Sequence, residues 1–102
     1  MDAALKAIAE PNRRRILRLV RDDELSAGEI ASHFDISWPA ISQHLGVLKE
    51  AGLVIDRPAG NRRIYRVDPD GLAALRAQLD RFWTRAMANY KQVVEQSTEE
   101  DQ

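Results

Sequence analysis

A small uncharged patch begins at residue 37, where the sequence reads SWPAISQHLGVLKEAGLV. Ile41, Leu45 and Leu48 recur at helical spacing and form one apolar stripe. The other face of the same helix collects Trp38, Pro39, Ser42 and Gln43. Serine and glutamine both donate and accept hydrogen bonds, and a glutamine amide can pair with adenine through two of them. The chemistry that these residue types offer is the recognition of a polar partner.

The distribution of charge favours an anionic partner for this patch. The chain of 102 residues has a net charge of −1, but residues 95–102 hold four acids and no base. The rest of the chain carries 15 basic and 12 acidic residues. Between residues 37 and 66, two acidic residues, Glu50 and Asp56, stand against Lys49, Arg57, Arg62, Arg63 and Arg66. A local basic excess beside a hydrogen-bonding face is typical of nucleic-acid-binding proteins.

Two helices are predicted before the patch. Residues 2–8 suit a short helix, in which Leu5 and Ile8 lie three positions apart. Pro11 fits the first turn of a second helix, which we expect to run to about Arg21, because the N–H that proline lacks has no partner there.

Two further helices form a helix-turn-helix. The sequence from Ser26 to Glu29 is a capping box and predicts a helix over residues 27–34. Ser37 is the expected N-cap of the next helix, and Gly52 is placed to end it. Two short helices separated by a three-residue connection are typical of this motif.

A basic hairpin follows the helix-turn-helix. Residues 53–57 and 63–67 are rich in β-branched side chains, and residues 58–62 form a turn cluster between them. The tip carries Asn61, Arg62 and Arg63. The fold class predicted is therefore mainly α with a small β-hairpin: a winged helix-turn-helix of about five helices and a two-stranded antiparallel wing.

A long last helix is expected to begin at Asp68-Pro69 and to persist to about Val94. Its apolar residues step by three and four positions, which is a heptad-like seam for pairing with another helix. The seam consists of Leu72, Leu75, Leu79, Phe82 and Ala86, widened by Trp83, Met87 and Tyr90. We predict one DNA-binding and dimerisation domain over residues 1–94 and a disordered acidic tail over residues 95–102.

The expected DNA contacts follow from the geometry of the motif, in which the second helix enters the major groove. The predicted DNA-binding residues are Ser37, Trp38, Pro39, Ser42, Gln43, His44, Asn61, Arg62 and Arg63. Among them, Ser42 and Gln43 are expected at base edges, and the two arginines at phosphates or in the minor groove.

Some of these residues also have simpler explanations. Trp38 is as well explained by partial burial as by contact with a thymine methyl group or a sugar. His44 lies beside the apolar stripe, where a packing histidine with a hydrogen-bonded ring is favoured. Arg62 and Arg63 have an alternative role as charges that protect a sheet edge. Four arginines on the second helix either meet the DNA backbone or pair with the acids that follow them: Arg13, Arg14, Arg15 and Arg18 against Asp22, Asp23 and Glu24.

The chain resembles the ArsR (SmtB/ArsR) family of bacterial transcriptional regulators over residues 3 to about 90. The runs that carry the resemblance are ALKAIAEPNRRRILRLV, ELSAGEIASHF, SWPAISQHLGVLKEAGLV and RPAGNRRIYRVDP. The resemblance implies a homodimeric winged helix-turn-helix protein, and most such proteins are repressors that leave DNA when an effector binds. It places the dimer interface on the first helix, with Leu5 and Ile8, and on the seam of the last helix. It places base contacts on Trp38, Pro39, Ser42 and Gln43, although many relatives carry glutamine at the position of Trp38.

The metal-sensing residues of this family are missing. Thiolate-sensing members carry two cysteines where this chain has Ser26 and Gly28, and the chain contains no cysteine. Other members bind metal between their last helices through aspartate and histidine. The last helix here has Asp70 and Asp80 but no histidine. We therefore predict no metal site and no cofactor.

The function predicted is a metal-independent homodimeric repressor that binds a pseudo-palindromic operator in double-stranded DNA. Its reading surfaces would be the recognition helix, about residues 38–51, and the wing, about residues 57–63. A protein-interaction winged helix and a regulator gated by an unidentified effector stay as alternatives. An enzyme is the least expected class, because no nucleophile elbow, phosphate-binding glycine loop or His-carboxylate cluster is visible. No transmembrane run or signal peptide is apparent, so a cytoplasmic location is expected.

Overall fold

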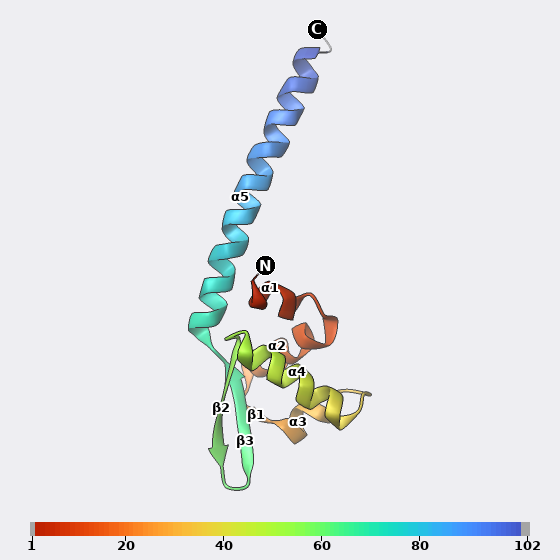
Figure 1. The fold of residues 1–102 in the computed structure, drawn as a ribbon, viewed down its shortest axis with the longest axis vertical. Coiled ribbons are helices and arrows are strands. Elements are labelled where there is room, and N and C mark those ends of the chain that lie inside the picture. The colour runs from red at the N-terminus through yellow and green to blue at the C-terminus, as the bar shows by residue number, and fades with distance from the viewer. Residues whose placement is uncertain (1, 101–102) are drawn as a thin grey trace. The chain divides into compact units, whose positions relative to one another are not determined.

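The computed structural model describes residues 2–100, with side chains through Ser97, and consists of two compact units. The described residues up to Leu72 form the first unit, and those from Ala73 onward form the second. The elements in chain order are α1 (Ala3–Ile8), α2 (Pro11–Asp22), β1 (Leu25–Ser26), α3 (Ala27–Ala31), α4 (Trp38–Glu50), β2 (Val54–Ala59), β3 (Arg62–Val67) and α5 (Pro69–Glu100). Figure 1 shows the helices α1 to α4 beside the strands, and this mainly helical winged architecture confirms the predicted fold class.

The helices of the first unit begin at side-chain caps, of which the sequence predicted those of α3 and α4. Ser26 and Glu29 form the predicted capping box, with the hydroxyl accepting from the Glu29 amide at 3.1 Å and the carboxylate accepting from the Ser26 amide at 2.9 Å. The hydroxyl of Ser37 accepts from the amide three residues along at 3.3 Å. Glu10 caps α2 by accepting from the Arg13 amide at 3.0 Å. Each cap satisfies an amide that has no partner inside its helix.

The apolar stripe of α4 is buried, as predicted. Ile41 and Leu48 are fully covered, and Leu45 is nearly so. Their neighbours in the core come from every other part of the first unit: Ala4, Ala7, Ile16, Val20, Ile30, Leu53 and Val54. Burial of each large aliphatic side chain contributes about 1.5–3 kcal/mol. This burial leaves the opposite face of α4 on the surface.

The sheet has a third strand that the sequence did not predict. Within residues 2–100 the strands form one antiparallel sheet in the order β1-β3-β2, in which Leu25 lies opposite Tyr65. A strand of two residues has no periodicity to detect, and its second residue, Ser26, also begins the capping box. The predicted two-stranded wing is therefore corrected to a two-stranded hairpin with a short third strand beside β3.

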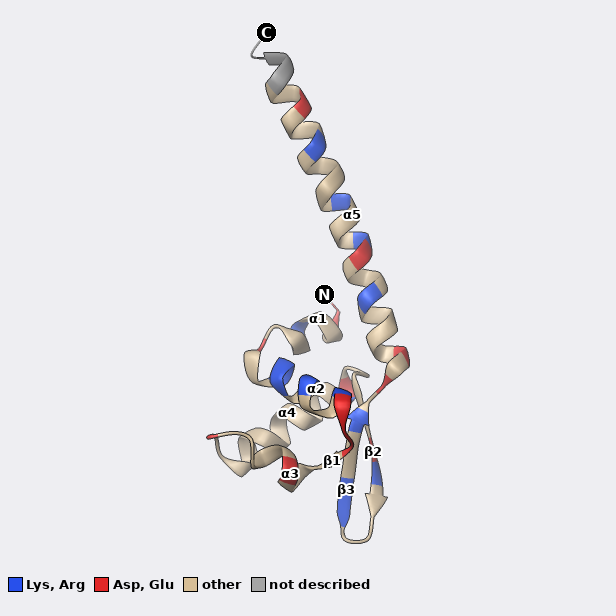
Figure 2. Cartoon of the chain, turned by 180° about the vertical axis from the view of Figure 1, so that it is seen from behind, with Lys and Arg blue, Asp and Glu red and all other residues tan. Residues whose placement is uncertain are grey.

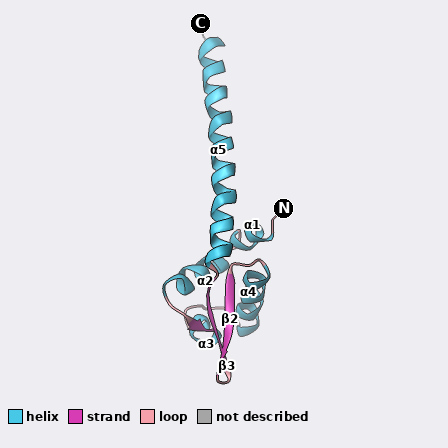
Figure 3. Ribbon diagram, turned by 90° about the vertical axis from the view of Figure 1, so that its left-hand side faces the viewer, coloured by secondary structure: helices cyan, strands magenta, loops and turns pink. Residues whose placement is uncertain are grey.

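The wing is a tighter hairpin than the sequence predicted. Ala59 pairs with Arg62, so the connection contains only Gly60 and Asn61 rather than five residues. Gly60 has φ of +64°, the conformation that glycine supplies at the first central position of a type II′ turn. Figure 3 shows the tip of this hairpin projecting beyond the helices of the first unit.

Two helix ends differ from the prediction. α3 ends at Ala31 instead of residue 34, and the amides of His33 and Phe34 donate to carbonyls three positions back, as in a tight turn. α5 continues to Glu100 instead of Val94. The helix therefore includes residues 95–100 of the acidic tail, whereas residues 101–102 lie outside the described part of the chain. Glu and Gln are good helix formers, and no glycine or proline stops the helix in this segment. The disorder of the tail stays a prediction.

The apolar residues of α5 are largely uncovered. Phe82, Trp83 and Tyr90 are 71%, 62% and 64% exposed, and Leu79 and Met87 are both 41% exposed. Among the other predicted interface residues, Leu75 is buried, and Leu5, Ile8, Leu72 and Ala86 are half-buried. No helix of the described chain is long and apolar enough to cross a membrane.

The end of α4 is joined closely to the start of α5. Gly52, with φ of +78°, closes a Schellman motif in which the Leu53 amide donates to the Leu48 carbonyl at 3.0 Å. Gly71 lies directly against this turn, and a Cβ at that position would overlap the carbonyl oxygen of Gly52. Both glycines belong to the first unit.

We predict that Gly71→Ala lowers the free energy of unfolding by about 1–3 kcal/mol, because backbone must move to admit the methyl group. Urea unfolding measures this change. The matched control is Gly46→Ala in the middle of α4, where an added Cβ meets nothing within 4 Å. That variant should gain about 0.5–1 kcal/mol from helix propensity. Equal stabilities for wild type and Gly71→Ala would contradict the prediction.

Candidate nucleic-acid interface

The outer face of α4 is the surface that the sequence predicted for DNA. Trp38 is 55% exposed, and Pro39, Ser42 and Gln43 are exposed beside it. Ser37 is also exposed, and it uses its hydroxyl to cap the helix. The structure therefore brings these five residues together on one side of one helix.

A groove of about 420 Å³ separates the start of α4 from the wing. It is lined by Ser26, Ala27, Gly28, Trp38, Ser42, Asn61, Arg62, Arg63 and Tyr65. Five of these nine residues were predicted to bind DNA, so the groove connects the recognition helix to the tip of the wing. Tyr65 was missed, although the two-residue period of a strand places it on the same face as Arg63.

The cations of the wing are mostly paired with carboxylates. Asp56 receives Arg63 Nε at 2.6 Å and Lys49 Nζ at 3.0 Å. Glu24 receives Arg57 Nη2 at 2.7 Å and lies 3.9 Å from Arg66 Nε. Arg62, which is exposed at the tip, makes no hydrogen bond or ion pair within the described chain.

The carboxylates that bind these cations stay ionised. The pKa of Asp56 lies below its usual value because Arg63, and then Lys49, donate hydrogen bonds that outweigh the opposing effect of burial. The pKa of Glu24 is lowered chiefly by the hydrogen bond from Arg57. Both groups are therefore anions at neutral pH, and the basic excess of the wing is reduced accordingly.

Three arginines of α2 bind backbone carbonyls, which neither alternative for them anticipated. Arg13 donates through Nε to the carbonyl of Ala7 at 2.7 Å, and Arg14 donates through Nη1 to that of Ile8 at 2.7 Å. Arg15 donates to the carbonyl of His33 at 2.7 Å. These carbonyls lie at helix ends, where cations are favoured. Figure 2 shows the positive residues gathered on α2 and along the hairpin.

His44 has the environment of a packing residue. Its side chain is 15% exposed, Nδ1 lies 3.4 Å from Arg13 Nη1, and Nε2 lies 3.9 Å from Glu10 Oε2. A guanidinium can only donate, so Nδ1 is placed as the acceptor in this contact. This geometry fits the packing alternative, and we do not carry His44 into the proposed DNA surface.

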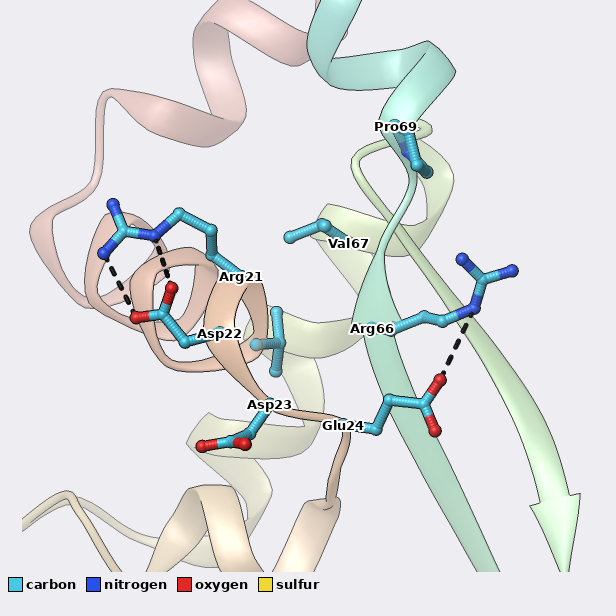
Figure 4. A pocket seen from close by; sticks show the side chains of 8 residues that line it. Arg21, Asp22, Asp23, Glu24, Arg66, Val67 and Pro69 are labelled. Atoms are coloured by element: carbon cyan, nitrogen blue, oxygen red, sulfur yellow. Dashed lines mark hydrogen bonds and ion pairs between the residues drawn. The ribbon is translucent and has the colours of Figure 1, made fainter.

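A second pocket, of about 220 Å³, lies between the end of α2 and the start of α5 (Figure 4). Arg21 pairs with Asp22 at 3.0 Å, and Arg66 faces Glu24. These charges mostly satisfy one another. In the part of the chain that the structure describes, no group of three or more His, Cys, Asp or Glu residues is placed to hold a metal ion.

Comparisons with known proteins agree over most of the chain. Residues 10–56 match the family of bacterial regulatory proteins described as the arsR family. The chain is 53% identical over 94 residues to the HTH-type transcriptional regulator Rv2034 of Mycobacterium tuberculosis. This match covers 92% of this chain and 88% of that protein. It is 43% identical over 68 residues to the transcriptional repressor SdpR of Bacillus subtilis, covering 67% and 76% of the two chains.

Solved structures share the fold. A possible transcriptional regulator for arsenical resistance is 47% identical, with a TM-score of 0.75, and the match covers 87% of this chain and 96% of that one. The homodimeric winged helix-turn-helix DNA-binding domain of Mb0332 from Mycobacterium bovis is 29% identical, with a TM-score of 0.66 and coverage of 83% and 79%. From these matches and the exposed face of α4, we conclude that the chain belongs to the ArsR family of bacterial regulatory proteins and is a DNA-binding transcriptional regulator.

Proposed function

We propose that this protein is a homodimeric, metal-independent repressor that reads a pseudo-palindromic operator with α4 and the β2–β3 wing. The observation that carries the proposal is the uncharged exposed face of α4, which shares a groove with a wing tip that presents an exposed arginine, Arg62. Contacts to phosphates position a protein on DNA, and contacts to base edges supply specificity. The two parts of the groove suit these two tasks.

The recognition helix supplies the base contacts. Ser42 and Gln43 lie within the first two turns of α4, where the motif brings residues to base edges in the major groove. Trp38 is exposed beside them and suits a thymine methyl group or a sugar. On the wing, Arg62 suits a phosphate because it is exposed and forms no salt bridge within the described chain, although the Glu29 carboxylate is near enough for its pKa to be lowered by Arg62.

The apolar stripe of α5 supplies the dimer interface. Large aromatic side chains that are 62–71% exposed along one helix face are unusual for a surface that stays in water. Pairing of two such stripes would present two recognition helices to successive major grooves, about 34 Å apart. The homodimeric state of the Mb0332 domain supports this arrangement.

Repression without metal has separate support. SdpR is named as a repressor, and it matches two thirds of this chain. The absence of cysteine excludes the thiolate chemistry of some family members. Dialysis against zinc followed by metal analysis should find no stoichiometric metal, and one retained zinc ion per subunit would refute metal independence.

Binding to the protein's own promoter region tests the DNA interface. Fluorescence anisotropy should show a salt-dependent complex that prefers this fragment to random DNA. We expect Arg62→Ala to reduce the slope of log K against log salt by about 0.9, the value for one phosphate. Gln43→Ala should instead reduce the preference between sequences by about 1–3 kcal/mol. Arg21→Ala removes a similarly exposed arginine that is paired with Asp22, and it should change neither quantity.

Sedimentation velocity tests the dimer. A charge at Trp83 would be desolvated in a paired stripe, so we expect Trp83→Glu to shift the protein to monomer and to weaken operator binding. Ala88→Glu adds the same charge at an exposed position on the opposite face of α5 and should leave the dimer intact. A wild-type protein that stays monomeric at micromolar concentration would refute the homodimer.

A further inference from the structure

We propose that Asp56 is a positioning residue for DNA binding. It holds the guanidinium of Arg63 by its Nε atom and thereby directs the terminal nitrogens toward a phosphate in the groove between α4 and the wing. Asp56 is not among the predicted contacts, and it acts on DNA through Arg63. This inference rests on the proposed function and names a determinant of its binding geometry.

The first observation is the burial of Asp56. Its side chain is only 6% exposed, and each carboxylate oxygen binds one cation: Lys49 Nζ at 3.0 Å and Arg63 Nε at 2.6 Å. Asp56 as a residue is half-buried, and the pairing of each oxygen with one cation fixes the orientation of its carboxylate. Lys49 belongs to the last turn of α4 and Arg63 to β3, so one carboxylate ties the wing to the recognition helix.

The second observation is that Arg63 is held at one edge only. Its Nε is the only atom of the guanidinium that bonds within the described chain, and the side chain is 54% exposed. Four N–H donors therefore remain on Nη1 and Nη2. Arg63 also lines the groove with Trp38 and Ser42. A guanidinium fixed in this way can bind a phosphate through two parallel hydrogen bonds.

The sheet register explains why Asp56 reaches this particular arginine. Asp56 lies opposite Tyr65, and Pro58 lies opposite Arg63, so Asp56 and Arg63 are diagonal neighbours on adjacent strands. Diagonal neighbours are within reach of long side chains. Because the arginine is already ordered before DNA binds, less side-chain entropy is lost on binding.

Glu24 offers a matched comparison. It also bridges two wing cations, Arg57 and Arg66, but neither of them lines the groove. Both carboxylates contribute one negative charge near the wing, and only Asp56 contacts α4 and the groove arginine. Removing the charge of either carboxylate should therefore change DNA affinity by repulsion alone to a similar degree. Only removal of Asp56 should also change how strongly Arg63 contributes to DNA binding.

A double-mutant cycle tests the proposal. The affinity for the promoter fragment is measured by anisotropy for wild type, R63A, D56N and the double variant. We expect R63A to weaken binding at least about threefold more when Asp56 is intact than in the D56N background. The cycle cancels the uniform gain in affinity that follows from removing a negative charge. In the E24Q background, R63A should cost the same as in wild type.

A second variant keeps the test valid if D56N folds poorly. Arg63→Lys keeps the charge but has neither Nε nor the planar fork, so it should bind DNA nearly as weakly as R63A. Wild-type affinity for Arg63→Lys would overturn the proposal. The proposal would also be overturned if R63A reduced DNA affinity equally in the wild-type and D56N backgrounds. A larger reduction in the D56N background would overturn it too, because Asp56 would then withhold Arg63 from DNA. A wild-type protein with no salt-dependent DNA complex would instead refute the proposed function.

Discussion

The surface chemistry of this protein depends on the burial of one face of α4. Ile41, Leu45 and Leu48 complete the core of the first unit, and their burial determines which way the helix faces. The face that carries Ser42 and Gln43 must then be exposed, because the two sets lie on opposite sides of the helix. A rotation of α4 that buried the polar face would leave hydrogen-bonding groups unsatisfied and would expose three large aliphatic side chains. The helical period of α4 therefore determines both which residues pack in the core and which residues remain exposed.

Most of the charged side chains discussed above pair with groups that lie close to them in the fold. Arg13 and Arg14 bind carbonyls at the end of α1. Glu24 binds two wing arginines, and Asp56 binds one wing arginine and Lys49 of α4. Arg62 forms no salt bridge within the described chain. The overall net charge of −1 therefore says little about what the surface presents to DNA. A few cations near the groove, held in known geometry, are of more use for orienting a duplex than a large diffuse positive charge.

The second unit differs from the first because its apolar residues are mostly exposed rather than buried. α5 carries an aromatic and aliphatic stripe that is largely exposed in one chain. A chain of this size buries only part of its apolar surface by folding alone. Association of two copies through α5 would cover the stripe and would place two α4 helices under one symmetry axis. The same apolar residues would then serve both stability and the spacing of the operator half-sites.

The sequence by itself determined the local features: the capping box of Ser26 and Glu29, the buried stripe of α4, the hairpin and the seam of α5. These features follow from residues within one to a few turns of one another, so spacing and residue type suffice to predict them. Only the tertiary structure decided the strand β1, the role of the α2 arginines, the position of His44 and the bridge at Asp56. The partners in these interactions come from different elements, such as His44 and Arg13, which are 31 positions apart. Many acids and bases in the chain could pair, and only the packing of the elements selects which of them meet.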